Sequence, residues 1–325
     1  MALVTQRPSI LAFISLVLLF SHSAIASPYS ELIVFGDSLS DNGNLFTATG
    51  NSSPPAPYYQ GRFSNGEVYS EILAAKLGAP VLQPALLGGS NYAWAGAFSA
   101  DDFSPFPGLT IPSIDRQVQT YLSTQSGIAR ADSLHIVFAG GNDLAALLDA
   151  GLNGVTGVGA ARSAAANIIT SVNDLISAGA DAIVVPNLPD LGLTPRFQAL
   201  ASDANALTRE FNSALAAGLF GLEQAIEFDT FAFLLDARTG FIEPNDPCFT
   251  GFTLCGTPEE HLFFDDFHPT HLFYQGFANA LQLTIAEAQA VPEPAIAILF
   301  GLGIMMLFIS QLLLKQPRTA YLYQT

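Results

Sequence analysis

Residues 31–44 read ELIVFGDSLSDNGN, and this stretch decides the fold. Residues 32–35 form a continuous apolar run, so we expect residues 31–35 to be a strand buried on both faces of a sheet. Gly36 and Asp37 then predict a turn. Ser38 follows that turn directly. Its hydroxyl is therefore expected at the carboxyl edge of the sheet, where ligands gather in open α/β folds.

Three further apolar segments predict strands at residues 134–139, 182–185 and, more weakly, 225–228. Alanine and apolar residues recur at helical spacing in residues 66–77, 114–122, 160–178 and 203–219. Strands and helices thus alternate, which favours an α/β fold with a mainly parallel sheet covered on both faces. Residues 51–57 and 101–112 are rich in Pro and Ser and are interpreted as loops.

The composition limits the possible partners. Acidic residues outnumber basic residues by 28 to 11, which gives a net charge of −17. Such a chain repels nucleic acid, so we expect no nucleic-acid partner. Half of the residues are hydrophobic, enough to form a substantial core without a metal or a disulfide framework. We expect a single domain over residues 27–290.

Both ends of the chain carry targeting patterns. Arg7, an apolar run over residues 10–20 and the small residues 24–26 predict a signal peptide over residues 1–26. Residues 295–314 are mostly apolar and uncharged, long enough for a transmembrane helix. Lys315 and Arg318 follow, which favours a cytoplasmic C-terminus and an exported middle section.

Residues 291–325 resemble a PEP-CTERM sorting signal, because Pro292-Glu293-Pro294 precedes the apolar segment and the basic residues. The resemblance implies processing by an exosortase-type enzyme, at least transient membrane contact through the C-terminal helix, and a location in or beyond the envelope of a Gram-negative bacterium. The final residues depart from the usual arginine-rich cluster, which leaves a permanent single-pass anchor as the alternative.

Three residues have the chemistry of a nucleophilic catalytic centre. Asp265 stands three residues before His268, close enough for one turn to bring the two side chains together. A serine hydroxyl needs an imidazole to remove its proton and a carboxylate to orient that imidazole. We predict Ser38, His268 and Asp265 for these roles and prefer Asp265 to Asp266 on spacing. Alternatively, Ser38 only caps a following helix.

Two glycine-containing segments could supply donors for an oxyanion. Asn142 lies in GGND at residues 140–143, after a predicted strand, and Gly96 lies in GSNYAWAGA at residues 89–97. Glycine allows close approach to a backbone N–H group. Taken alone, each segment is equally typical of an ordinary turn.

Together these segments resemble the SGNH, or GDSL, hydrolase family, whose blocks carry Ser, Gly, Asn and His in this chain order. The resemblance covers roughly residues 31–289. It implies a flavodoxin-like three-layer α/β/α sandwich and an esterase, lipase or acyltransferase activity. It also implies that the N–H of Ser38 joins Gly96 N–H and the Asn142 side chain in the oxyanion hole. Ala95 departs from the glycine that many relatives have at this position.

The sequence therefore predicts an exported serine esterase or lipase that acts on a small-molecule or lipid ester through an acyl-enzyme intermediate, with no cofactor and no metal. The alternatives are an acyl or acetyl transferase or deacetylase acting on extracellular polysaccharide, and an inactive surface-binding protein. Activity is expected to rise with pH through an ordinary histidine pKa of ~6.5. Cys248 and Cys255 are predicted to form a disulfide that shapes the loop leading to Asp265.

Overall fold

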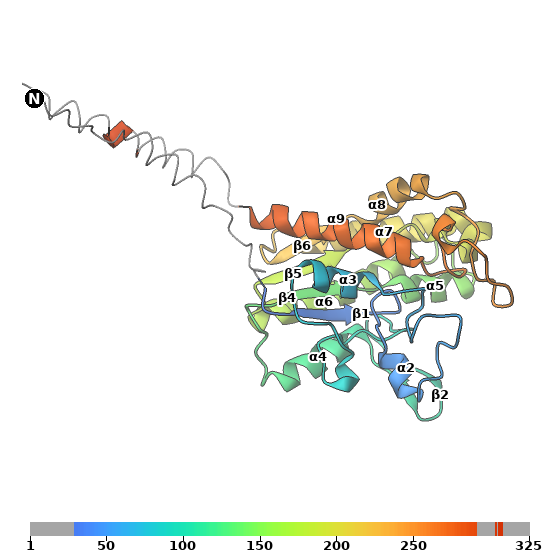
Figure 1. The fold of residues 1–325 in the computed structure, drawn as a ribbon, viewed down its shortest axis with the longest axis horizontal. Helices are drawn as coiled ribbons and strands as arrows, with labels where there is room; N and C mark the ends of the chain where they lie inside the picture. The colour runs from blue at the N-terminus through green and yellow to red at the C-terminus, as the bar shows by residue number, and fades with distance from the viewer. Residues whose placement is uncertain (1–28, 291–302, 304, 308–325) are drawn as a thin grey trace, which may run out of the picture. The chain divides into compact units, whose positions relative to one another are not determined.

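A computed structural model of the chain describes residues 29–290, 303 and 305–307 (Figure 1). The predicted signal peptide, residues 1–26, and most of the predicted sorting signal with its apolar segment, residues 295–314, lie outside the described residues. The chain divides into two units, Met1–Gln282 and Leu283–Thr325. Within the described ranges, no helix has the length and apolar character needed to cross a bilayer.

A sheet of four parallel strands occupies the centre of the first unit, in the order β1-β4-β5-β6. The strands are β1 (Leu32–Gly36), β4 (Leu134–Phe138), β5 (Ala182–Pro186) and β6 (Ala225–Phe228). All four predicted strands are confirmed, with ends within one residue of the prediction. Because the strands are parallel, their carboxyl ends meet along one edge of the sheet.

Helices cover both faces of this sheet (Figure 1). On one face, Tyr69 of α3 (Tyr69–Lys76) and Phe277 of α9 (His271–Gln289) pack against Phe138. On the other face, Tyr121 of α4 packs against Phe35. The helices of this second layer are α4 (Ile114–Thr124), α6 (Val158–Ser177) and α7 (Ala201–Leu219). The predicted three-layer α/β/α class is confirmed.

The loop predicted at residues 101–112 is wrong, because this segment forms a two-stranded antiparallel ribbon, β2 (Phe103–Phe106) and β3 (Leu109–Ile111). In β3, Leu109 and Ile111 are buried and Thr110 is exposed, the alternation of a half-buried strand. The flanking Pro and Gly residues hid this short pattern. The structure also adds helices that were not predicted, namely α2 (Asn44–Ala48), α5 (Gly141–Asp149) and α8 (Thr230–Ala237).

Candidate active site

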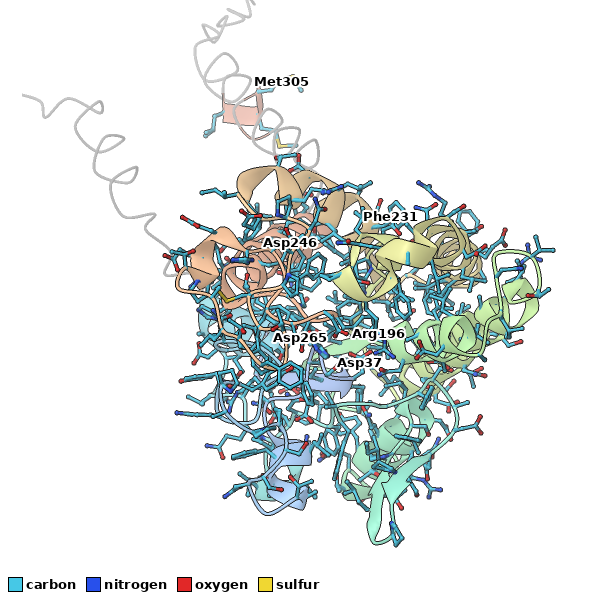
Figure 2. All side chains as sticks on the ribbon, turned by 90° about the vertical axis from the view of Figure 1, so that its right-hand side faces the viewer. Asp37, Arg196, Phe231, Asp246, Asp265 and Met305 are labelled. Carbon is cyan, nitrogen blue, oxygen red and sulfur yellow. A yellow bond between two sulfur atoms is a disulfide. The ribbon has the colours of Figure 1, made fainter. Side chains whose placement is uncertain are left out.

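Ser38 lies two residues beyond β1, at the carboxyl edge of the sheet, and is 5% exposed. Its Oγ lies 2.8 Å from Nε2 of His268, although 230 residues separate the two in the chain. Figure 2 shows Asp37 and Asp265 in the central part of the face on which this site lies. The structure thus brings the predicted nucleophile and base into hydrogen-bond contact.

The side chain of Asp265 holds the other nitrogen of the imidazole. Nδ1 of His268 lies 2.8 Å from Oδ2 and 3.0 Å from Oδ1 of Asp265. Oδ1 also accepts the backbone N–H groups of Phe267 (2.8 Å) and His268 (2.6 Å). The Asp265 carboxylate therefore stabilises the tight turn and also orients the imidazole ring of His268. With Nδ1–H donating to Asp265, Nε2 is free to accept a proton from Ser38.

The carboxylate and the imidazole shift each other's pKa. Burial raises the pKa of Asp265, but the charge of His268 and the hydrogen bonds outweigh burial and lower this pKa to about 2. Burial lowers the pKa of His268, but the charge and hydrogen bond of Asp265 outweigh it, so this pKa stands above its ordinary value. Asp265 therefore stays ionised, and His268 gains a proton more readily than a free histidine.

Two neighbouring carboxylates support the loops around the site. Asp37 accepts the N–H of Leu39 at 3.0 Å, and Asp143 accepts the N–H of Ser99 at 3.0 Å. Both carboxylates therefore hold the backbone of loops that border the site. Burial raises the pKa of Asp37 to about 6, although the Leu39 N–H and the charge of His268 act in the opposite direction.

Residues 90–94 run beside β1 and bring the glycine block to Ser38. The N–H groups of Tyr92 and Trp94 donate to the carbonyls of Val34 (2.7 Å) and Gly36 (3.0 Å). The buried Asn91 ties the same segment to the loop after Ser38, because its Nδ2 donates to the Ser40 carbonyl at 2.7 Å. This pairing places the end of the block next to the nucleophile.

The backbone N–H groups of the glycine block differ in what they donate to. The N–H of Ala95 donates to Oδ2 of Asp41 at 2.9 Å, and the N–H of Ala97 donates to the Trp94 carbonyl at 3.0 Å. Among the residues that the structure describes, no group accepts the N–H of Gly96. Gly96 has φ +86°, a conformation that favours glycine. Gly96, which lines a cavity together with Ser38, therefore has an N–H available for an oxyanion.

Two further donors lie close to this glycine. Nδ2 of Asn142 uses one hydrogen on the Ala97 carbonyl at 2.9 Å and retains a second. Asn142 stands in the first turn of α5, where the positive end of the helix dipole also favours negative charge. The N–H of Ser38 has no acceptor in the described part of the chain. Gly96 and Asn142 line one cavity together with Ser38.

Two cavities meet at Ser38. The larger one has about 300 Å³ open to the centre of a water molecule, and its lining includes His268, Gly96, Asn142 and Arg196. The smaller one has about 40 Å³ by the same measure and is lined almost entirely by apolar side chains. These come from the loop after β5 and from the helices α8 and α9, and include Leu188, Leu234, Phe273 and Phe277. His268 lines only the larger cavity.

Tyr58, which no pattern in the sequence indicated, donates its hydroxyl hydrogen to Oδ2 of Asp265 at 2.7 Å. Its neighbourhood in the chain is a Pro-rich stretch with no apolar periodicity, so no signal pointed to a partner 207 residues away. Cys248 and Cys255 form a disulfide. The backbone of Cys248 and Phe249 donates to the carbonyls of Phe263 and Phe264, directly before Asp265.

Comparisons of the sequence with known proteins point to one family. The sequence model described as GDSL-like Lipase/Acylhydrolase matches residues 32–281. Lipase 1 of Photorhabdus luminescens is 32% identical over 183 residues, 55% of this chain and 25% of that protein. The phosphatidylcholine-sterol acyltransferase of Aeromonas hydrophila is 32% identical over 206 residues, 62% of this chain and 58% of that protein. The chain thus spans between a quarter and three fifths of the length of these two relatives.

Among solved structures, the native aryl esterase of M. smegmatis superimposes with a TM-score of 0.47 and 17% identity. The superposition covers 80% of this chain and 99% of that one.

Proposed function

The chain belongs to the GDSL-like lipase/acylhydrolase family of carboxylic ester hydrolases, and from this premise we propose that it is a serine esterase that works through Ser38, His268 and Asp265. The observation that carries this proposal is the unbroken line of contacts from Ser38 Oγ through both ring nitrogens of His268 to the carboxylate of Asp265. That line is the arrangement a serine needs to become a nucleophile.

The reaction proceeds in two steps. Ser38 Oγ attacks the ester carbonyl while Nε2 of His268 takes its proton, and the carbonyl oxygen becomes an oxyanion bound by the N–H groups of Ser38 and Gly96 and the amide of Asn142. His268 then gives the proton to the departing alcohol, which leaves an acyl group on Ser38. A water molecule, deprotonated by His268, then attacks this acyl group. The bond between Ser38 Oγ and the acyl carbon breaks, His268 returns the proton to Ser38 Oγ, and the carboxylic acid departs.

The two cavities assign the two parts of the ester. Since His268 must reach the leaving oxygen, the alcohol portion belongs in the larger cavity that His268 lines. The acyl group then enters the smaller apolar cavity. Only about 40 Å³ of this cavity is open to the centre of a water molecule, against about 300 Å³ in the larger cavity, so the acyl side is the narrower of the two. The geometry therefore favours short apolar acyl groups.

The test is a series of p-nitrophenyl esters from acetate to dodecanoate, assayed with the full chain. We expect hydrolysis with kcat/KM highest among the short esters, because longer chains overfill the apolar cavity. Absence of turnover on every ester would favour the inactive surface-binding protein. A maximum at dodecanoate would overturn the assignment of the smaller cavity.

Transfer of the acyl group to an alcohol is the second candidate, because one relative is named as an acyltransferase and the chemistry up to the acyl-enzyme is shared. The larger cavity that releases one alcohol can admit another. Product analysis with glycerol or a soluble polysaccharide present distinguishes the two. An acylated acceptor indicates transfer, and free acid alone indicates hydrolysis.

Export is also part of the proposal, on the patterns at the two ends of the sequence. The protein is made with a signal peptide over residues 1–26, crosses the inner membrane, and carries a C-terminal sorting signal over residues 291–325 that an exosortase-type enzyme processes. Mass spectrometry of the protein recovered from the producing cell is expected to give an N-terminus at Ser27. Recovery of the protein with residues 1–26 intact contradicts this proposal.

The pH dependence of the reaction follows from the charges around His268. Its neutral form is the active base, and Asp265, Asp37 and Asp266 raise its pKa against the opposing effect of burial. A raised pKa means that the neutral form disappears at a higher pH as the solution is acidified. We therefore expect kcat/KM for a neutral ester to fall on the acid side with a midpoint above 6.5.

The measurement is kcat/KM between pH 5 and pH 9 for the wild type and for Asp37→Asn. Asp37 titrates in the same range, near pH 6, so its removal shows which group sets the midpoint. Loss of its negative charge is expected to lower the midpoint. A midpoint at or below 6.5 in the wild type would contradict the raised pKa of His268.

A further inference from the structure

We propose that Tyr58 is a positioning residue of the reaction, which fixes the carboxylate of Asp265 and sets how strongly that carboxylate acts on His268. This inference rests on the proposed esterase function. Tyr58 is the one side chain, other than His268, that the described structure places in hydrogen-bond contact with Asp265. Its hydroxyl therefore completes the set of donors around this carboxylate.

Both oxygens of Asp265 lie within hydrogen-bond distance of Nδ1 of His268, and each oxygen has further donors of its own. Oδ1 accepts the backbone N–H groups of Phe267 and His268, which belong to the same turn. Oδ2 accepts Nδ1–H of His268 at 2.8 Å and the Tyr58 hydroxyl at 2.7 Å. Without Tyr58, no group from outside the turn would hold Oδ2. The carboxylate could then rotate away from the plane of the imidazole.

The ring of Tyr58 is held from three sides. Its centroid lies 5.4 Å from that of Phe63, 5.7 Å from that of Phe249 and 5.3 Å from that of Phe264. Phe63 also lies 5.0 Å from the ring of His268, so the same cluster contacts the base directly. An aromatic ring restrained in this way presents its hydroxyl at a fixed position with little loss of entropy on binding.

The disulfide loop supplies one side of this enclosure. Phe249 follows Cys248 in the loop closed by Cys255, and its N–H donates to the Phe264 carbonyl at 2.6 Å. The disulfide therefore anchors the ring that packs edge-on against Tyr58. This gives the predicted influence of the disulfide on Asp265 a physical route, through Phe249 and Tyr58.

The hydroxyl also affects the proton balance of the site. Burial and the neighbouring charge of Asp265 raise the pKa of Tyr58, so it remains a donor throughout the working range. Because the Tyr58 hydroxyl donates a hydrogen bond to Asp265, the attraction between this carboxylate and protonated His268 is weakened. The other charged groups that face His268 are Asp37, Asp266 and, across the larger cavity, Arg196. All three are unchanged when only the hydroxyl is removed.

The test compares Tyr58→Phe with Tyr59→Phe in the full chain. Phenylalanine keeps the ring and its packing and removes only the oxygen. For Tyr58→Phe we expect kcat to fall about tenfold, the value of one hydrogen bond to a charged group, with KM little changed. We also expect the acid midpoint of kcat/KM to move to higher pH. Without the Tyr58 hydrogen bond, Asp265 stabilises protonated His268 more strongly and raises the pKa of His268 further. Tyr59, whose ring lies 5.8 Å from the Arg62 guanidinium, is the control and should change neither.

The outcomes separate this inference from the function itself. If Tyr58→Phe retains the wild-type kcat and acid midpoint while Ser38→Ala is inactive, the role of Tyr58 is wrong and the esterase proposal stands. If Ser38→Ala is as active as the wild type, the proposed function fails first. Melting temperatures of both tyrosine variants should stay close to that of the wild type. A large decrease for Tyr58→Phe, with an unmoved midpoint, would indicate a structural role only and would overturn the inference.

Discussion

Ser38→Ala is expected to reduce kcat for a short p-nitrophenyl ester by about ten-thousand-fold or more. The substitution removes the atom that attacks the carbonyl, and no other hydroxyl is in hydrogen-bond contact with Nε2 of His268 in the described structure. Residual turnover would come from oxyanion binding and positioning of a water molecule, which together still exceed the uncatalysed rate. The measurement is kcat from initial rates at saturating ester, with mass spectrometry to detect the acylated protein.

Ser171→Ala is the matched control. Its hydroxyl is also buried, lies in α6 far along the chain from the site, and has no hydrogen-bond partner within the described part of the chain. Its removal should leave kcat unchanged. If Ser38→Ala kept more than a small percentage of the wild-type rate, or if an acyl group were found on another residue, Ser38 would not be the nucleophile.

Asp265→Asn is expected to lower kcat by about ten-thousand-fold while leaving the fold intact. The amide can still accept the N–H groups of Phe267 and His268 through its oxygen, so the turn survives. Its NH₂ group, however, would donate to Nδ1 of His268 and place the ring proton on Nε2. A protonated Nε2 cannot take the proton of Ser38, and the base is lost although every side chain remains in place.

Asp266→Asn tests the choice between the two adjacent carboxylates. The backbone carbonyl of Asp266 accepts the N–H of Arg196, and this contact does not depend on its side chain. The Asp266 charge contributes only a small part of the raised pKa of His268. A change of no more than a few fold in kcat is therefore expected. Equal losses for the two variants would contradict the assignment of Asp265 as the partner of His268.

Much of the fold follows from local sequence. Each central strand is a short, mainly apolar segment that ends at a glycine, a proline or a polar turn, so its position could be predicted without knowledge of its neighbours. The β2–β3 ribbon did not follow, because its short alternation is interrupted by prolines that usually mark loops. Residues 90–94 were also not expected to run beside β1. Their place depends on Asn91 reaching the Ser40 carbonyl, a contact between distant parts of the chain.

The residues of the site also fall into those that local sequence predicts and those that it does not. Asp265 and His268 could be paired in advance, since three residues of spacing and a turn are local properties. Gly96 could be proposed from its block, but the reason that the N–H of Ala95 is not available could not, because Asp41 accepts this N–H from 54 residues away. Tyr58 carries no pattern at all until the folded chain brings it to Asp265. Side chains whose role is set by a single long-range contact are the ones that local reasoning misses.

The separation of Ser38 and His268 by nearly the whole domain has a consequence for biosynthesis. During translation, the turn after β1 that carries Ser38 is made early, whereas His268 is added 230 residues later. Every nascent or truncated form that ends before residue 268 therefore lacks the proposed base. On the proposed mechanism, esters of the producing cell therefore meet no active enzyme while the chain is still incomplete. The proposed base is complete only when the chain has reached the residues directly before α9 (His271–Gln289), so the appearance of activity would report that nearly the whole domain has been made.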